Sequence, residues 1–376
     1  MSTNISRRRF ARGAAALSLL PLIAACGGSD DPPSAEGAYF AAVQALMAKY
    51  HLPGVLAGVR VAGRAQWTRA FGQANLASQT PLALESTFPI RSVTKSFTCT
   101  ALLQLVREAQ LTLDDKIGRY VAGVPNGDLI SLADLAGMQS GLADYSSADG
   151  FLTIFIANTR HVWTEAELVA FGLAEKPGFL PGAQYQYSNT NTVLLGMVIE
   201  AVTGLSLGEA LQARVFTPKQ LAGTSYPAVA TLPAPAPTPY SVNVNTGAAD
   251  EQPLISPTSL AGAGAINSTL ANLLDWGDEL GSGSLIGASL QDLRKSRSRA
   301  VTNGPEYDRY GLGIGQIGDW WGHTGSGVGF QIATMNLAAR GATISVMVNA
   351  TPEGSRRDLN FAQEVFEGLA AVVAAS

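Results

Sequence analysis

The predicted strands of this chain fall into two groups, one near each end, and this arrangement constrains the fold most. Apolar runs of strand length, bounded by glycine and polar residues, predict these segments. They cover residues 55–61 and 66–71 in the first group and 318–323, 329–336 and 342–349 in the second. Short turns join the second group, so its strands should pair antiparallel. We expect an α/β fold, with an antiparallel sheet flanked by helices and built from both chain ends.

Helical patterns occupy most of the sequence between the two groups of strands. Predicted helices lie between the groups at 192–202 and 270–280, before the first group at 37–50, and after the second at 356–373. Residues 227–257, rich in Pro, Ala, Thr and Asn, read as an irregular loop. The domain of residues 37–376 would therefore have an α/β lobe, about 37–95 and 258–376, and an inserted, mainly helical lobe, about 96–257. A cleft between two lobes often binds a ligand.

Composition excludes some classes of protein. The chain has 376 residues, of which 47% are hydrophobic and 14% charged, and this is enough for a large core. The net charge of −4 gives no reason to expect a nucleic-acid partner. The three histidines, His51, His161 and His323, are far apart in sequence, and no HExxH or CxxC pattern occurs. No metal or other cofactor is therefore predicted.

Residues 1–25 have the pattern of an export signal. Ser6-Arg7-Arg8-Arg9-Phe10 is a twin-arginine segment, and the apolar stretch from Ala14 to Ala25 is short for a membrane span. Its end, Leu22-Ile23-Ala24-Ala25-Cys26, resembles a bacterial lipoprotein signal, in which the cysteine is lipidated; an ordinary cleaved signal is the alternative. Residues 26–36 would then form a flexible tether. We expect a periplasmic protein that contacts the membrane through its lipid alone and, because Gly27 follows the cysteine, an outer-membrane anchor.

Cys99 is the second of the two cysteines. After lipidation of Cys26 it would have no partner for an internal disulfide, so the exported domain must be held together by its core. Cys99 lies on the helix expected after Ser92, and we expect a buried apolar role there.

Ser92 and Lys95 form the first candidate catalytic element. They lie one helical turn apart in Arg91-Ser92-Val93-Thr94-Lys95-Ser96-Phe97, so the amine can reach the hydroxyl. A serine hydroxyl is a weak nucleophile near neutral pH and needs a base beside it. Pro89 limits upstream extension of the helix, which would place Ser92 at the helix N-terminus. By itself this spacing is common.

The second element is Tyr187-Ser188-Asn189, in a loop before the helix expected from Thr192. A phenol near a lysine ammonium can be held as phenolate, because the positive charge favours the charged form. It could take a proton from Ser92 and deliver it to a leaving group. Asn189 offers both a donor and an acceptor to a substrate amide. A polar helix-capping loop is the alternative.

The third element is His323-Thr324-Gly325-Ser326-Gly327 at the end of a strand. Small residues would let a substrate backbone lie along this strand, and free N–H groups on its edge can stabilise an oxyanion. A glycine-rich hairpin is the alternative. Ser241-Val242-Asn243 is a rival Ser-x-Asn element, but it lies in the Pro-rich loop.

The three elements together resemble the penicillin-recognising serine hydrolases: class C β-lactamases, serine D-alanyl-D-alanine carboxypeptidases and related esterases. The resemblance covers about 40–370 and implies a β-lactamase/transpeptidase-like fold. It is closest to the carboxypeptidase branch at the segments around Ser92, at 185–191 and at 322–325. Where the usual β-lactamase has lysine, this chain has His323. Class A relatives have a sibling pattern with the same Ser-x-x-Lys core.

The resemblance implies roles for these residues. Ser92 would be the acylated nucleophile, with Lys95 and Tyr187 sharing the base and acid duties. Asn189 would bind the substrate amide. The strand that pairs with the substrate would include His323, Thr324 and Gly325, and the backbone N–H groups of Ser92 and Ser326 would form the oxyanion hole.

Gly315 departs from the carboxypeptidase pattern. In that branch, the stretch that resembles Tyr310-Gly311-Leu312-Gly313-Ile314 is followed by an arginine that helps to hold the substrate carboxylate. Here that position is Gly315, and Arg309 is the nearest cation in sequence. Loss of a carboxylate clamp weakens binding of a free peptide C-terminus.

The sequence therefore predicts a serine acyl hydrolase that uses an acyl-enzyme. D-peptides, including peptidoglycan peptides, small esters and β-lactams are the candidate substrates. An α/β-hydrolase would carry its nucleophile in GxSxG at a strand-to-helix turn; that pentapeptide occurs once, at 204–208, where it follows the predicted helix 192–202 and no predicted strand. The alternative is a cell-envelope binding protein that retains the fold with weak catalysis.

Overall fold

The computed structural model describes residues 35–301, 307–354 and 359–376. The predicted export signal, including Cys26, lies outside these residues. Within them, no single helix is long and apolar enough to cross a membrane, although the bent pair Asn189–Thr203 and Leu207–Phe216 meets the length and composition requirement when taken together.

A nine-stranded antiparallel sheet forms the centre of the α/β part, in the order β3-β2-β1-β13-β12-β11-β10-β9-β8. Its strands are β1 (Gly54–Val61), β2 (Trp67–Asn75), β3 (Thr80–Pro81), β8 (Arg299–Ala300), β9 (Arg309–Tyr310), β10 (Gly315–Ile317), β11 (Trp320–Gly327), β12 (Phe330–Leu337) and β13 (Ala342–Val348). Both chain ends contribute, because β1 pairs with β13 from Val55 to Val61. The expected antiparallel sheet built from both ends is confirmed.

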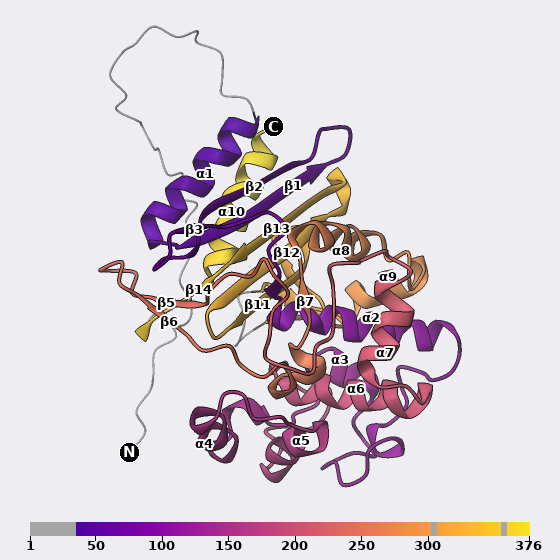
Figure 1. The fold of residues 1–376 in the computed structure, drawn as a ribbon. Helices are drawn as coiled ribbons and strands as arrows, with labels where there is room; N and C mark the ends of the chain where they lie inside the picture. The colour runs from indigo at the N-terminus through magenta and orange to yellow at the C-terminus, as the bar shows by residue number, and fades with distance from the viewer. Residues whose placement is uncertain (1–34, 302–306, 355–358) are drawn as a thin grey trace, which may run out of the picture.

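Helices cover both faces of this sheet (Figure 1). One face carries α1 (Ala35–Tyr50) and α10 (Phe361–Ala375), and the other carries α8 (Leu270–Ser282). Strands β1, β12 and β13 are buried almost throughout, since apolar side chains leave them on both faces. This explains why their sequences are continuous apolar runs.

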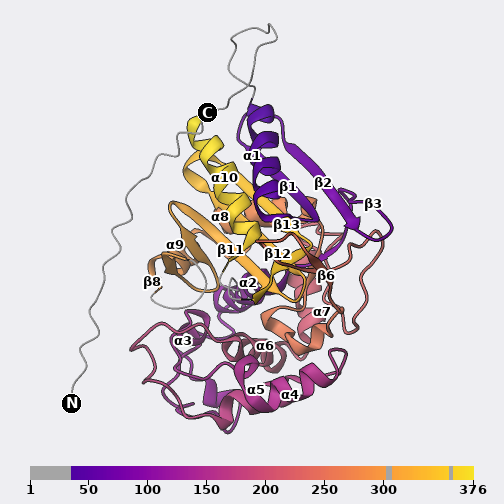
Figure 2. The same cartoon turned by 90° about the vertical axis from the view of Figure 1, so that its left-hand side faces the viewer.

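A mainly helical part packs below the α8 face and extends away from the sheet (Figure 2). Its helices are α2 (Thr94–Arg107), α3 (Leu132–Ala136), α4 (Asp149–Ala157), α5 (Glu165–Ala174), α6 (Asn189–Thr203) and α7 (Leu207–Leu211). Helix α9 (Ala288–Ser296) lies beside the outer strand β8 (Figure 2). Helix α2 is buried from Thr94 to Leu105, so it is the core element that joins the helical part to the sheet.

The expected elements largely recur, although the helix expected from Thr192 begins at Asn189 and the strand expected at 318–323 is Trp320–Gly327. The loop at 227–257 contains two short strands, β5 (Tyr240–Val242) and β6 (Ala249–Glu251), which form a small sheet with β14 (Ala350–Pro352). The short strands β8, β9 and β10 were not predicted, because runs of two or three residues carry no periodic signal. The last helix begins at Phe361 rather than near residue 356.

Candidate active site

A tight turn before α2 positions Ser92. Strand β4 (Phe88–Pro89) pairs with β7 (Asn267–Ser268), and the Ile90 N–H continues this pairing to the Ile266 carbonyl at 2.8 Å. A short 3₁₀ turn, Arg91–Val93, then leads into α2. Arg91 has a φ of +51°, a conformation uncommon for a side-chain-bearing residue. Ser92 therefore lies in the turn just ahead of the helix, and it keeps partial exposure to solvent.

The Lys95 ammonium group is fully enclosed beside Ser92. Its Nζ lies 3.0 Å from Ser92 Oγ, 2.7 Å from Asn189 Oδ1 and 2.8 Å from the Ala263 carbonyl oxygen. The Lys95 side chain has no exposed surface. Burial lowers the pKa of Lys95 to about 7, against an opposing effect of Asp144. A substantial fraction of the amine is therefore neutral near pH 7.

The Tyr187 ring completes one wall of this site. Lys95 Nζ lies 4.9 Å from the ring centroid. Residue Tyr187 is partly exposed, but its hydroxyl oxygen is buried near the Ser92 hydroxyl. Burial raises the pKa of Tyr187 well above its ordinary value, although the nearby Ser92 hydroxyl acts to lower it. The expected phenolate is therefore disfavoured: removal from water outweighs the effect of the Ser92 hydroxyl, and the phenol stays protonated.

Asn189 connects Lys95 to a carboxylate that the sequence did not single out. Asn189 is the first residue of α6, and while its Oδ1 accepts from Lys95, its Nδ2 donates to Asp144 Oδ2 at 3.0 Å and to Ser146 Oγ at 3.2 Å. Its amide is thus committed on both sides to groups of the protein. In the structure this amide orients Lys95, and the expected binding of a substrate amide by Asn189 stays a prediction.

Strand β11 lies against the Ser92 turn. A Cβ atom added at Gly325 would lie 2.4 Å from the Ile90 carbonyl oxygen and 3.1 Å from Ser92 N, so the approach requires glycine. The Thr324 N–H points away from β12, since it donates to the Tyr307 hydroxyl. Alternate N–H groups of a strand point to the same side, so the Ser326 N–H faces this outer edge too. The predicted oxyanion donors, Ser92 and Ser326, therefore come from adjacent segments.

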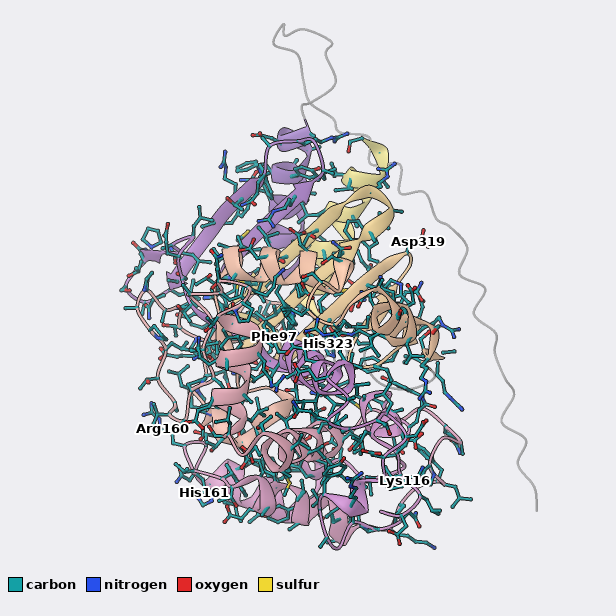
Figure 3. The ribbon with its side chains drawn as sticks, turned by 90° about the vertical axis from the view of Figure 1, so that its right-hand side faces the viewer. Phe97, Lys116, Arg160, His161, Asp319 and His323 are labelled. Atoms are coloured by element: carbon teal, nitrogen blue, oxygen red, sulfur yellow. The ribbon has the colours of Figure 1, made fainter. Side chains whose placement is uncertain are left out.

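His323 lies at the centre of the molecule, where the sheet meets the helical part (Figure 3). Its side chain is fully buried, with Tyr307 Oη 3.1 Å from Nδ1 and Tyr310 Oη 2.9 Å from Nε2. Burial, together with Lys95, lowers the pKa of His323 to about 3. His323 lies in β11, and its imidazole is a neutral, buried group; the expected pairing of a substrate with this strand stays a prediction.

Arg309 does not replace the arginine that is absent at Gly315. Its guanidinium is exposed and donates to the Ser298 hydroxyl at 2.9 Å and the Ser298 carbonyl at 2.7 Å. Neighbouring strand residues point to opposite faces, and Tyr310, the next residue, is the one that contacts His323.

Sequence reasoning missed Asp144, Tyr307 and the Ala263 carbonyl. Asp144 follows no motif, but its position before Tyr145-Ser146-Ser147 is a helix-capping pattern, and its side chain does accept from the Ser146 N–H. Tyr307 and Ala263 carry no local signal. Within the described residues, no group of three or more His, Cys, Asp or Glu side chains could hold a metal ion. Cys99 is buried as expected, and burial raises its pKa to about 12.

Comparison with known proteins places this geometry in a family. The model of the family described as Beta-lactamase matches residues 40–366. That is most of the chain, and the chain therefore belongs to this family, as the sequence motifs indicated. The sheet built from both ends and the helical part agree with the fold of its solved relatives.

Several of the similar proteins have names that refer to D-amino acids or to D-stereospecificity. A D-aminopeptidase from Brucella anthropi is 34% identical over 177 residues, which are 47% of this chain and 33% of that protein. The chain thus spans about a third of the length of this relative. A D-stereospecific amidohydrolase from Streptomyces sp. superposes with a TM-score of 0.76 at 29% identity, covering 89% of this chain and 98% of the other. A D-amino acid amidase from Ochrobactrum anthropi SV3, complexed with L-phenylalanine amide, gives 0.81 at 22%, covering 91% and 99%.

Proposed function

We propose that this protein is a serine hydrolase that cleaves the amide bond on the carbonyl side of a D-amino acid residue, through an acyl-enzyme on Ser92. The observation that carries the proposal is the enclosed Lys95 amine, 3.0 Å from a partly exposed serine hydroxyl and with a pKa of about 7. Amides of a D-amino acid are favoured over the D-alanyl-D-alanine peptides that a carboxypeptidase cleaves, because similar proteins are named D-aminopeptidase and D-stereospecific amidohydrolase.

Lys95 acts as the base in this mechanism. A neutral amine has two hydrogens and one lone pair. Asn189 Oδ1 and the Ala263 carbonyl accept the two hydrogens, so the lone pair is left for the Ser92 hydroxyl proton. Ser92 Oγ then attacks the substrate carbonyl as its proton passes to Lys95. The backbone N–H groups of Ser92 and Ser326 stabilise the oxyanion.

Tyr187 acts as the acid. Its protonated phenol lies beside Ser92 with a buried hydroxyl, where it can donate a proton to the departing nitrogen and be reprotonated from Lys95. The carbon–nitrogen bond breaks, the amine leaves, and water then attacks the Ser92 ester. The second step returns the serine and releases the carboxylic acid.

The position of the Asp144 carboxylate favours a substrate that has a free amino group. A D-amino acid amide carries an α-ammonium group. The half-buried Asp144 carboxylate is close to Lys95, since the Asn189 side chain bonds to both. An acidic group near the acyl side would attract this cation. Such attraction gives no advantage to a β-lactam or a neutral ester.

A substrate panel tests the proposal. D-alanine amide should be hydrolysed faster than L-alanine amide, D-Ala-D-Ala and a chromogenic cephalosporin, and a fluorophosphonate should label Ser92. Ser92→Ala should abolish labelling and lower kcat by roughly 10⁴-fold or more. Labelling that survives Ser92→Ala, or equal rates with L-alanine amide, would overturn the assignment.

We also propose that the protein works in the periplasm, attached to the outer membrane through Cys26. The lipoprotein-like sequence at 22–26 supports this location. Fractionation of cells that express the full chain and its Cys26→Ser variant tests it, since the variant should move from the membrane fraction to the soluble periplasmic fraction.

A further inference from the structure

Tyr307 occupies the outer edge of β11 next to the candidate nucleophile. Its hydroxyl oxygen accepts from the Thr324 N–H at 2.6 Å and lies 2.8 Å from Thr324 Oγ1. The residue is only 5% exposed. Tyr307 therefore covers both polar groups that Thr324 would otherwise offer to a ligand at this edge.

This edge is otherwise open to a substrate. Strand β10 pairs with β11 only as far as Gly322, and within the described residues no strand continues the pairing along 323–327. The edge thus presents two outward N–H groups, those of Thr324 and Ser326. The first is capped by Tyr307, whereas the second lies in the segment that passes the Ser92 turn. Tyr307 closes one end of the substrate strand and leaves the oxyanion end accessible.

Gly315 makes room for the tyrosine. A Cβ atom at Gly315 would lie 2.3 Å from Cδ1 and 2.4 Å from Cε1 of the Tyr307 ring. These distances are far below any real contact, so a side chain at 315 and the tyrosine in this position exclude each other. Gly315, where the resemblance places an arginine, is therefore what allows Tyr307 to reach Thr324, because the Tyr307 ring fills the space that a side chain at 315 would need.

A carboxylate cannot be bound well at this end of the edge. The Tyr307 hydroxyl oxygen accepts from the Thr324 N–H, and its one hydrogen has Thr324 Oγ1 within reach at 2.8 Å, while His323 Nδ1 donates to the Thr324 carbonyl oxygen. His323 offers no positive charge, because burial keeps its pKa at about 3. The Arg309 guanidinium is held by Ser298. The two buried cations that act on His323 already have partners: Lys95 donates to Asn189 and the Ala263 carbonyl, and Arg294 to the Leu312 and Ser96 carbonyls. A carboxylate here would displace the phenol without gaining a free cation, which is costly in a buried site.

From these contacts we propose that Tyr307 is a specificity-determining residue that closes the leaving-group side of the site to groups bearing a carboxylate. The protein then acts as an amidase: Ser92 Oγ bonds to the acyl carbon of a primary amide, and ammonia leaves with the transferred proton. Peptides with a free carboxylate on the residue after the scissile bond are poor substrates. This inference rests on the proposed function for the acyl group, although the leaving-group effect holds for any acyl group.

The test compares leaving groups in the wild type and Tyr307→Ala. The substrates are D-alanine amide, the dipeptide D-Ala-Gly and its C-terminal amide, D-Ala-Gly-NH₂, which separates charge from size. The wild type should prefer D-alanine amide, and D-Ala-Gly should be the poorest of the three. Tyr307→Ala should raise kcat/KM for D-Ala-Gly relative to D-alanine amide by about tenfold or more. An unchanged ratio in the folded variant would overturn the inference.

Two further variants keep this test decisive. Gly315→Ala displaces the Tyr307 ring without removing it and should shift the ratio in the same direction, so it replaces Tyr307→Ala if that protein does not fold. Tyr185→Phe is the matched control, because Tyr185 packs on Tyr310 in the same aromatic cluster, 5.8 Å between centroids, without contacting Thr324. Its ratio should equal that of the wild type. Stoichiometric fluorophosphonate labelling measures the active fraction of each protein.

A pair of esters separates failure of the inference from failure of the proposed function. Phenyl acetate and 4-carboxyphenyl acetate share an acyl group that contains no amino acid and differ in the charge of the leaving group. If D-alanine amide is not hydrolysed but the wild type prefers phenyl acetate and Tyr307→Ala loses that preference, the inference stands and the D-amino acid assignment fails. If both esters react equally in both proteins, Tyr307 does not select the leaving group.

Discussion

The two sides of the site differ in where their contacts originate. On one side, Ser92 and Lys95 are three residues apart on one turn of chain, and their geometry follows from helical spacing. On the other side, the β11 edge is shaped by Tyr307, a residue 17 positions from Thr324 that reaches it across the sheet edge. The chemistry is thus encoded locally, whereas the choice of leaving group depends on a tertiary contact.

The two sides also differ in charge near neutral pH. Lys95 has a pKa of about 7, so its protonation changes in the range where the protein would work. His323, on the β11 side, has a pKa of about 3 and stays neutral. The pH dependence of activity should therefore arise on the Ser92 side, and the pH dependence of stability should carry a contribution from the β11 side.

The largest expected effect separates the roles of the two groups beside Ser92. Lys95→Ala removes the base and should slow acylation by roughly 10³–10⁴-fold, while Tyr187→Phe removes an acid and should slow it by about 10²-fold. The measurement is the pre-steady-state burst with a chromogenic ester for both variants. An activated ester needs little protonation of its leaving group, whereas an amide needs it. With D-alanine amide, Tyr187→Phe should therefore lose more activity than with the ester, and its rate should come closer to that of Lys95→Ala. A larger loss in Tyr187→Phe than in Lys95→Ala with the ester would make Tyr187 the base.

The sequence predicted the Ser92 side better than the β11 side for a physical reason. Ser92 and Lys95 belong to one short run whose spacing fixes their relative placement. Tyr187 was selected through the three elements taken together, and the structure brings its side chain to Lys95. The protonation of Tyr187 was predicted wrongly because desolvation depends on how completely the fold covers a hydroxyl, and no run of residues reveals that.

Strand periodicity likewise indicated the central sheet but not its outer strands. Strands β1, β12 and β13 are seven or eight residues long and apolar, whereas β9 and β10 have two and three residues. The sequence showed that Gly315 departs from the carboxypeptidase pattern. It could not show that the Tyr307 ring fills the space beside Gly315, because the two residues come together only when the outer part of the sheet forms. For the same reason, no sequence pattern predicted that the Tyr307 hydroxyl would accept a hydrogen bond from the Thr324 N–H.

Asp144→Asn should shift the pH dependence that Lys95 provides. The Asp144 carboxylate raises the Lys95 pKa, so its removal should lower that pKa further. More of the amine is then neutral at low pH, and the acid limb of the kcat profile should move to lower pH by a few tenths of a unit to about one unit. The measurement is kcat for D-alanine amide between pH 5 and 9.

The same substitution should raise KM for D-alanine amide, if Asp144 attracts the α-ammonium group, without raising KM for phenyl acetate. Asp149→Asn, on the exposed start of α4, is the control and should leave both the pH profile and KM unchanged. An acid limb that moves to higher pH in Asp144→Asn would show that the carboxylate does not act on Lys95.

The smallest effect concerns stability and isolates the β11 side. Folded His323 has a pKa of about 3, whereas the unfolded chain binds a proton on this residue near pH 6.5. Between these values the unfolded state holds more protons, so the free energy of unfolding should fall as the pH drops from about 6.5 towards 3.

Urea unfolding at pH 7 and pH 4 should show that His323→Asn loses less stability over this interval than the wild type, by on the order of 3 kcal/mol. His51→Asn, at an exposed position, should retain the wild-type dependence. Equal pH dependence in His323→Asn and the wild type would mean that the imidazole is not held neutral, and the argument that the β11 edge lacks a cation for a carboxylate would lose one of its supports.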